Sequence, residues 1–264
     1  MKFFLFFLII FFNCQIFSQS PFKIFPGEKL YQMYYADAIT HQFSLLKDFG
    51  SNDWYGNIGS NQPLLNFDIN NNTYQITIAA TVFNTLKIKP PHIQVFTADY
   101  LVDLFLDTDL GHNYLMRFNW GHVSAHFVDD GILQLNQTSI NYIRDYISLQ
   151  AEKIISIING KIYIAATYNF HNEPRKSKHY RLQLGFDAGK NIADDIILYL
   201  AFDFKLKAEV NNGTTKALQI GLRFHNNSGS SIRLAYTYRT GYEERGQLYN
   251  LINHQNLLGL YFDF

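Results

Sequence analysis

The chain has 264 residues, enough for one domain with a full-sized core or for one mid-sized barrel. Its formal net charge is zero, so no strongly basic face indicates a nucleic-acid partner. The only cysteine is Cys14, which lies in the predicted leader. The mature chain would therefore have no cysteine, which excludes a disulfide framework and a thiolate metal site, and we expect no cofactor.

Aromatic residues make up 17% of the chain, with 24 Phe and 18 Tyr. Membrane β-barrels place such residues on the lipid face and in the girdles at the two membrane surfaces. A soluble periplasmic β-sandwich rich in Tyr has a similar composition, so composition alone does not choose between the two classes.

Residues 1–19 are expected to form a cleaved secretory signal peptide. Lys2 precedes an apolar run from Phe3 to Phe12, which is too short to span a bilayer as a helix, and small residues lie near Ser18 and Ser20. A lipoprotein would need small residues just before Cys14, where two phenylalanines and an asparagine stand. No later segment has the sequence of a transmembrane helix, so a membrane location would require a barrel.

From about Leu64 onward, successive segments carry apolar residues at every second position. The alternate positions carry glycine and charges of both signs, as expected for a narrow lumen filled by side chains. The residues expected to face outward are Tyr74, Ile76, Ile78, Val82, Tyr100, Val102, Leu104, Leu106, Tyr114, Met116, Phe118, Trp120, Tyr180, Leu182, Leu184, Phe186, Leu198, Leu200, Phe202, Phe204, Leu206, Leu218, Ile220, Leu222, Phe224, Ile232, Leu234, Tyr236, Tyr238, Leu258, Leu260, Phe262 and Phe264.

The segments are about ten residues long, which matches a tilted transmembrane strand. We therefore predict an all-β fold: a single up-and-down antiparallel transmembrane barrel of about twelve strands over residues 41–264. Weaker strands are expected near His41 to Phe49 and Leu64 to Ile69. Residues 20–40 are expected to form a periplasmic or plug-like segment.

The breaks between strands alternate in length. If Phe264 lies on the periplasmic side, the long breaks Thr240 to Asn253 and Asp129 to Ser139 are extracellular. The short breaks Asn226 to Ser230 and Ile158 to Lys161 are then periplasmic, as outer-membrane barrels require. We expect a location in the outer membrane of a Gram-negative bacterium. Outer-membrane lipids and the barrel-assembly machinery, through the C-terminal strand, are the expected partners.

Ten charged residues are expected to face the lumen, and we expect them to pair and fill the barrel. The alternative is that they line a narrow pore or a ligand pathway. These residues are Asp99, Asp103, Arg117, Arg144, Arg181, Asp187, Asp203, Arg223, Arg233 and Arg239.

The strand that ends its apolar pattern at Trp120 continues with His122, Ser124 and His126 on the same face. This is the lipid face near its extracellular end, where polar side chains are costly unless they lie at the membrane surface or have partners. The three residues can therefore be either the polar rim of the strand or a functional site.

The next strand carries Asn141 and Asp145 on the same face as the outward Ile143. A hairpin that turns near Gly131 puts His122 opposite Asn141. A turn centred two residues later puts His122 opposite Asp145. Both registers keep every face correct, so both remain open.

These residues supply the parts of a hydrolytic triad. Ser124 would be the nucleophile, His122 the general base, and Asn141 or Asp145 would orient the imidazole. Because the triad would face lipid, its substrate would be a lipid. A metal site that uses His122, His126 and Asp129 or Asp130 is a further alternative, although no standard ligand spacing is present.

The His122-x-Ser124 pair resembles two families of outer-membrane lipid hydrolases, outer-membrane phospholipase A and lipid A 3-O-deacylase. Both carry His-x-Ser on a lipid-facing strand and an Asn or Glu on the following strand, which Asn141 or Asp145 would match here. Those families have Asn after the Ser, whereas Ala125 and His126 follow Ser124 in this chain, and the loop to the third residue is longer.

A broader resemblance covers Tyr100 to Phe264. This stretch looks like the bacterial outer-membrane proteins grouped as domain of unknown function 1207, a family without an established activity. The likeness rests on three features: Asp99-Tyr100 before a strand, His122-x-Ser124-x-His126 followed by acids at Asp129 and Asp130, and the end from Leu258 to Phe264.

Two functions follow from the sequence. The first is a non-catalytic outer-membrane barrel with a structural, binding or narrow-pore role. The alternative is an acyl-ester hydrolase for phospholipid or lipid A that acts through Ser124 and His122. The sequence does not give the substrate, the oligomeric state or the role of residues 21–40.

Overall fold

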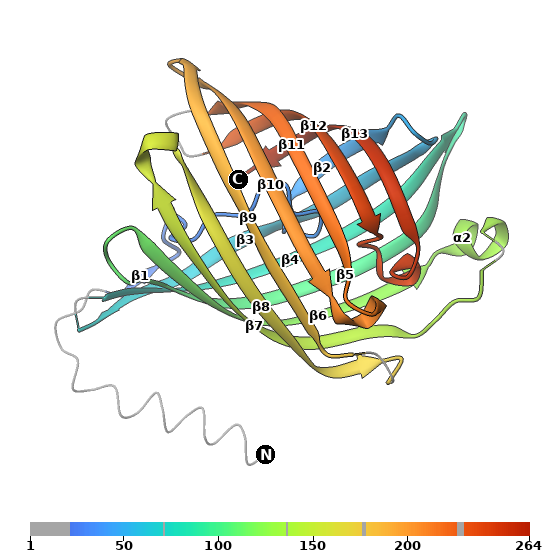
Figure 1. Cartoon of the computed structure of the whole chain (residues 1–264), viewed down its shortest axis with the longest axis horizontal. Helices are drawn as coiled ribbons and strands as arrows, with labels where there is room; N and C mark the ends of the chain where they lie inside the picture. Colours follow the sequence, from blue (N-terminus) through green and yellow to red (C-terminus); the bar gives the residue numbers. More distant parts are fainter. Residues whose placement is uncertain (1–21, 71, 136, 176–177, 226–229) are drawn as a thin grey trace.

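The strands of the computed structural model form one antiparallel sheet that closes on itself (Figure 1). The structure describes residues 22–70, 72–135, 137–175, 178–225 and 230–264, so the predicted signal peptide lies outside the described residues. The strands are β1 (Lys23–Ile24), β2 (Phe43–Asp48), β3 (Asp53–Ile69), β4 (Asn72–Lys89), β5 (His92–Asp109), β6 (Tyr114–Phe127), β7 (Tyr142–Ile155), β8 (Gly160–Glu173), β9 (Tyr180–Ala193), β10 (Ile196–Lys207), β11 (Gly213–His225), β12 (Ser231–Tyr242) and β13 (Ile252–Asp263).

Strands β2 to β13 surround the lumen in chain order, and β2 closes the barrel by pairing with both β13 and β3. The short β1 adds to the edge of β3. The predicted single antiparallel barrel of about twelve strands is therefore confirmed. The short helices are α2 (Asp129–Gln134), η2 (Ser156–Ile158), η3 (Ala208–Val210) and η4 (Gly246–Leu248). Within the described residues, no helix is long and apolar enough to cross a membrane.

Strands β3, β4 and β5 are longer than the sequence indicated, with 17, 18 and 18 residues. The first half of β3 is rich in Asn, Gly and Ser, so it lacks the apolar alternation of a strand, and Pro63 follows in the second half. The register between β3 and β4 shifts between Pro63 and Leu65. A bulge there accommodates a residue that has no N–H to give to the ladder.

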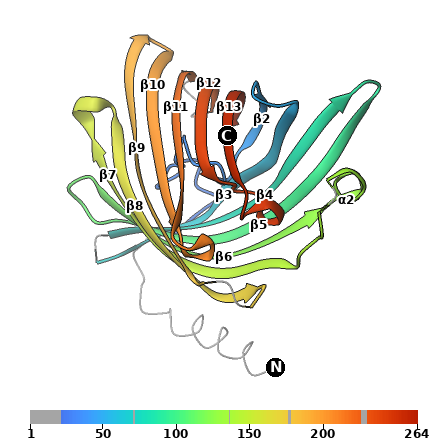
Figure 2. The same cartoon turned by 45° about the vertical axis from the view of Figure 1, so that its right-hand side comes forward.

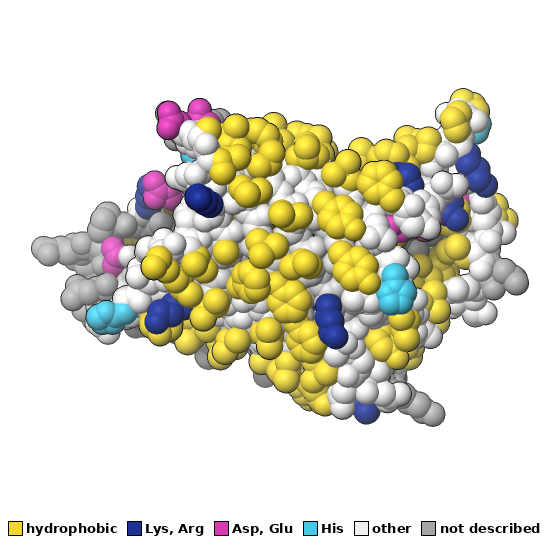
Figure 3. All heavy atoms as spheres, turned by 45° about the horizontal axis from the view of Figure 1, so that its top comes forward, with side chains coloured by type: hydrophobic (Ala, Val, Ile, Leu, Met, Phe, Trp, Pro, Cys, Tyr) yellow, Lys and Arg dark blue, Asp and Glu magenta, His cyan; other side chains and the backbone are white. Residues whose placement is uncertain are grey.

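The outer face of the barrel is apolar, as the alternation predicts. Outward leucines and isoleucines in the middle of these strands are 40–49% exposed, as at Leu184, Leu200, Ile220 and Ile232. Hydrophobic side chains cover the middle of this face, and charged residues and histidines lie nearer its two ends (Figure 3). Such a continuous apolar surface exceeds what a water-soluble monomer normally exposes.

The lumen is filled with polar side chains, as expected. Most of the predicted inward charges are buried, and Arg181 and Arg223 are half-buried. Arg117 donates two hydrogen bonds to Asp107, with N–O distances of 2.6 and 2.8 Å. Arg233 binds Asp263 in the same bidentate way at 2.8 and 3.0 Å. Both geometries satisfy charges that would be costly to bury alone.

The segment before β2 also lies in the lumen, between the barrel walls (Figures 1 and 2). Tyr34 stacks on Tyr163 with 3.5 Å between ring centroids, and the Arg117 guanidinium lies 4.3 Å from the centroid of Tyr31. Lys161 donates hydrogen bonds to the carbonyl oxygens of Gln32 and Met33. Residues 31–42 therefore contact the inner wall of the barrel, and we call them the lumen segment.

Lys205 joins this segment to the connection between β12 and β13. Its ammonium lies 2.6 Å from Asp37 in the segment, 3.1 Å from Glu244 in the β12–β13 connection and 3.9 Å from Asp203. Burial by itself would raise the pKa of the Glu244 carboxyl, but Lys205 and Lys207 hold that pKa well below its usual range. Three carboxylates therefore share the buried Lys205 ammonium, and Lys207 is a second cation at Glu244.

Replacing Lys205 by Ala should destabilise the barrel by about 3–5 kcal/mol, because it leaves these carboxylates buried without their shared cation. Lys190→Ala, at an exposed position of β9, is the matched control and should change the free energy of unfolding by less than about 0.5 kcal/mol. Denaturant unfolding in detergent micelles measures both. Equal effects would contradict the role given to Lys205.

Candidate active site

The outward face of β6 carries three polar residues after Trp120. His122 and His126 are exposed, and Ser124 is half-buried between them. Their neighbours in the sequence, Gly121 and Ala125, are buried on the lumen side. The strand therefore presents His122, Ser124 and His126 on the outside of the barrel, where the alternation had predicted them.

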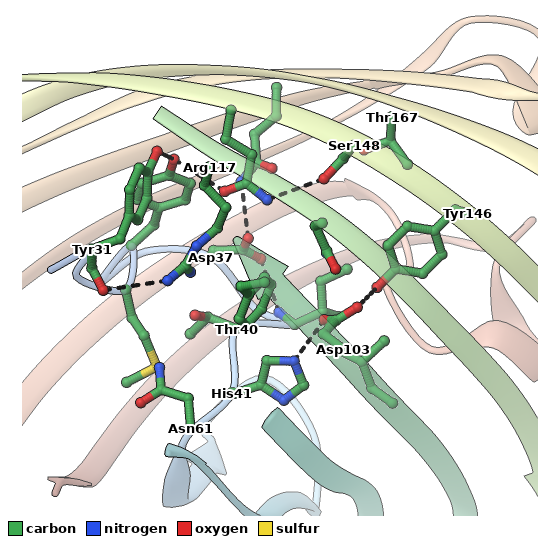
Figure 4. A pocket seen from close by; sticks show the side chains of 18 of the residues that line it. Tyr31, Asp37, Thr40, His41, Asn61, Asp103, Arg117, Tyr146, Ser148 and Thr167 are labelled. Carbon is green, nitrogen blue, oxygen red and sulfur yellow. Dashed lines mark hydrogen bonds and ion pairs between the residues drawn. The ribbon is translucent and has the colours of Figure 1, made fainter. Parts of the chain in front are cut away.

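A contact inside the lumen fixes the register between β6 and β7. Tyr146 pairs with Gly121, and its Oη donates a 2.7 Å hydrogen bond to Asp103 on β5, on the other side of β6 (Figure 4). A Cβ at Gly121 would lie 2.6 Å from that Oη, so only glycine leaves room for the Tyr146 ring to cross the strand. Asp103 also binds His41 at 2.6 Å, so the carboxylate that accepts from Tyr146 also contacts the lumen segment.

This register puts Asp145 directly opposite His122. The distance from His122 Nδ1 to Asp145 Oδ1 is 2.6 Å, and the side chains are 46% and 29% exposed. A carboxylate only accepts hydrogen bonds, so the imidazole donates its Nδ1–H. In the neutral imidazole the lone pair is then on Nε2, as a general base requires.

Asn141 is not brought to His122. It lies just before β7, outside the strand, and is exposed. The helix α2 occupies the β6–β7 connection, and the turn is centred later than Gly131, as in the second of the two registers. The amide version of the triad, with Asn141 as its third member, therefore lacks the geometry it needs.

Ser124 pairs with Ile143 on β7 and with Tyr100 on β5. Within the described part of the chain, no hydrogen bond joins Ser124 to His122, although both side chains lie on the same face of β6 two residues apart. Catalytic hydrogen bonds are often absent before substrate binds, so this spacing is compatible with a nucleophile and its base.

The sequence did not point to His171, which is the second imidazole at this site. Its Nδ1 lies 2.7 Å from Asp145 Oδ2, and its side chain is 49% exposed. A strict two-residue period after Tyr168 would turn His171 into the lumen. A shift in the β7–β8 register between Asp145 and Tyr146 instead leaves Phe170 and His171 both exposed. A bulge of this kind has no sequence signature that could have revealed it.

The residues of the alternative metal site, His122, His126 and Asp129 or Asp130, do not come together. Asp130 accepts a hydrogen bond from the backbone N–H of Val95 at 3.1 Å, and the His126 ring packs against Tyr100 with centroids 5.9 Å apart. Among the described residues, no group of three or more His, Cys, Asp or Glu side chains is arranged to hold a metal ion.

Lumen residues form a second polar cluster around a cavity of about 70 Å³ (Figure 4). It is lined by Asp37 and His41 of the lumen segment and by Asp103, Arg117 and Tyr146 of the wall. His41 and Tyr146 both bind Asp103, while Arg117 binds Asp107 and Asp37 binds Lys205. The cavity is therefore the space left between groups that already have partners, and it has room for only a few water molecules.

Comparison with known proteins identifies the family. The family model described as "Protein of unknown function (DUF1207)" matches residues 26–264, and the chain belongs to this family, as its sequence indicated. No curated protein matches the chain.

Solved structures of outer membrane phospholipase A are similar to this chain. The Escherichia coli protein has a TM-score of 0.54 and 14% identity over 85% of this chain and 92% of that one. The Salmonella typhi phospholipase dimer with bound calcium has a TM-score of 0.54 and 14% identity over 85% and 90%. At this identity the likeness establishes an outer-membrane-type barrel fold and nothing about activity.

The hydrogen bond to Asp145 should hold His122 in the tautomer with the proton on Nδ1. Asp145→Ala should abolish this state, whereas Asn141→Ala should preserve it, because only Asp145 reaches the ring. Long-range ¹⁵N–¹H spectra of the imidazoles in detergent micelles distinguish the tautomers. Loss of the signature in Asn141→Ala, with retention in Asp145→Ala, would contradict this geometry.

Proposed function

We propose that this member of the DUF1207 family is an outer-membrane barrel whose outer face hydrolyses acyl esters of membrane lipids. The observation that carries the proposal is the 2.6 Å contact between His122 and Asp145 beside Ser124, on the outside of the barrel. Polar groups are costly on a face that otherwise contacts lipid, so a partnered His–Asp pair there favours a chemical role.

The apolar outer face supports the membrane location. Its strands carry Leu, Ile, Phe and Tyr outward, while charges are confined to the lumen and to the ends. Phe264, at the end of β13, would lie at the periplasmic side, and α2 would lie at the extracellular side. His122 and Ser124 then face the outer leaflet beyond Trp120, at the depth where lipid ester groups lie.

The filled lumen argues against the pore function. Residues 31–42 occupy the interior, and Lys205, Arg117 and Lys161 bind them from the wall. A solute would have to displace several buried ion pairs and a stacked tyrosine pair to pass. Ester hydrolysis on the outer face does not require a solute to pass through the lumen.

The reaction would follow the serine-hydrolase scheme. Ser124 Oγ attacks the ester carbonyl carbon while His122 Nε2 takes the hydroxyl proton, and Asp145 stabilises the imidazolium that forms. The imidazolium then gives this proton to the departing alcohol, which leaves an acyl group on Ser124. Water, deprotonated by His122, attacks the acyl carbon. The His122 imidazolium then gives this proton to Ser124 Oγ as the fatty acid leaves.

The oxyanion needs a hydrogen-bond donor, and the strand backbone does not offer one. Ser124 and Ala125 are paired with both β5 and β7, so their N–H groups belong to the sheet. His126, two residues after Ser124 on the same face, is the side chain we assign to this role.

Ile220→Arg tests the membrane location. Ile220 lies at the centre of β11, is 49% exposed and faces outward between Leu200 and Tyr236. In a bilayer the substitution should destabilise the protein by about 2–4 kcal/mol, because the charge would lie near the hydrophobic midplane. Ile157→Arg, in the fully exposed turn after β7, is the control and should have little effect. Equal effects in phospholipid vesicles would exclude a membrane-embedded face.

Ser124→Ala tests the enzymatic activity. The purified wild-type protein should release fatty acid from phospholipid or lipid A vesicles, and Ser124→Ala should lower kcat at least about 10³-fold, because the nucleophile is lost. Ser60→Ala, at an exposed outward position of β3, should retain wild-type activity. Equal release by wild type and Ser124→Ala, or no release by either, would reject hydrolysis at this site.

A further inference from the structure

One carboxylate at this site serves two histidines on different strands. Asp145 Oδ1 binds His122 Nδ1 of β6 at 2.6 Å, and Asp145 Oδ2 binds His171 Nδ1 of β8 at 2.7 Å. Each oxygen therefore has its own donor. Because the carboxylate only accepts, both imidazoles donate their Nδ1–H.

The β8 bulge is what brings His171 to this position. Tyr146 pairs with Asn169, whereas Asp145 pairs with His171, so Phe170 has no partner of its own on β7. Without the extra residue, Asp145 would lie opposite Phe170 and the imidazole would face the lumen. Bulges of this kind often re-aim side chains next to active sites.

Two charged residues lie beside His171. Its Nε2 lies 4.0 Å from Glu173 Oε1, and Arg175 binds that same oxygen at 3.2 Å. On β5 the residues opposite the site are Tyr100 and Val102, which add no charge. The ionisable groups at the site are therefore His122 on β6, Asp145 on β7, His171 and Glu173 at the end of β8, and Arg175 just after it.

We propose that His171 is a positioning residue of the hydrolytic site, which holds the Asp145 carboxylate so that its other oxygen stays on His122. The inference rests on the proposed function. A terminal carboxylate rotates over a broad range about its last bond, and a partner on only one oxygen would leave it free to turn. With both oxygens bound, the His122 ring keeps one orientation and its Nε2 keeps the direction in which Ser124 lies.

Substitution of His171 by Asn and by Leu separates orientation from mere packing. The side-chain N–H₂ of Asn lies about where Nδ1 of His does, so His171→Asn keeps a donor for Asp145. His171→Leu fills the space with an apolar side chain and removes the donor. His254→Leu is the matched control, since His254 is exposed on the outside of β13, where it binds Thr240.

Two readouts are needed, kcat and KM on phospholipid vesicles and the imidazole ¹⁵N–¹H spectrum of His122. His171→Leu should lower kcat about 10- to 100-fold with little change in KM, and the His122 Nδ1–H signal should broaden or vanish through faster exchange. His171→Asn should retain most of kcat and the signal, and His254→Leu should match the wild type in both.

The outcomes separate the two claims. An unchanged His122 signal in His171→Leu would overturn the positioning role, whatever the activity. A lost signal together with an unchanged kcat would also overturn it. If the wild type releases no fatty acid while His171→Leu loses the His122 signal and His171→Asn keeps it, the proposed function fails and the positioning contact stands.

Discussion

The hydrogen bond from Tyr146 to Asp103, made over Gly121, is the interaction on which the arrangement of the outer face depends. Antiparallel strands can slip by two or four residues and still keep every side chain on its correct face. The Tyr146 ring removes that freedom, because only one position of β6 lacks a Cβ beneath it. The register that satisfies this lumen contact also puts Asp145 opposite His122 on the other side of the sheet.

The contacts in the lumen and those on the outer face therefore both follow from the register between β6 and β7. Inside, Asp103 binds Tyr146 and His41, and the segment of residues 31–42 completes a set of buried ion pairs that leaves little free volume. Outside, β6 and β7 present His122 and Asp145 on an apolar wall, and β8 adds His171. Under the proposed function, a barrel with a filled lumen and one polar place on its apolar outer face would act on the membrane around it.

The barrel was predictable because apolar and polar residues alternate in many successive segments. An error in one strand therefore does not change the predicted fold. The faces of His122, Ser124 and Asp145 followed from the same period. The choice between Asn141 and Asp145 could not be predicted in this way, because it depends on how the Tyr146 ring passes over Gly121 of the neighbouring strand. His171 was not predictable either, since a single inserted residue at Phe170 reverses the face of everything after it. The entry of residues 31–42 into the lumen depends on partners such as Lys205, which lie far away in the sequence.

The central claim is that Ser124 is an activated nucleophile facing lipid. Treatment of the vesicle-embedded protein with a long-chain alkyl sulfonyl fluoride, followed by peptide mass spectrometry, tests it most directly. The sulfonyl group should be transferred to Ser124 Oγ with loss of fluoride, and His122→Ala should abolish the adduct while Ser60 stays unmodified. Absence of the adduct on Ser124, or equal labelling in His122→Ala, would contradict the account.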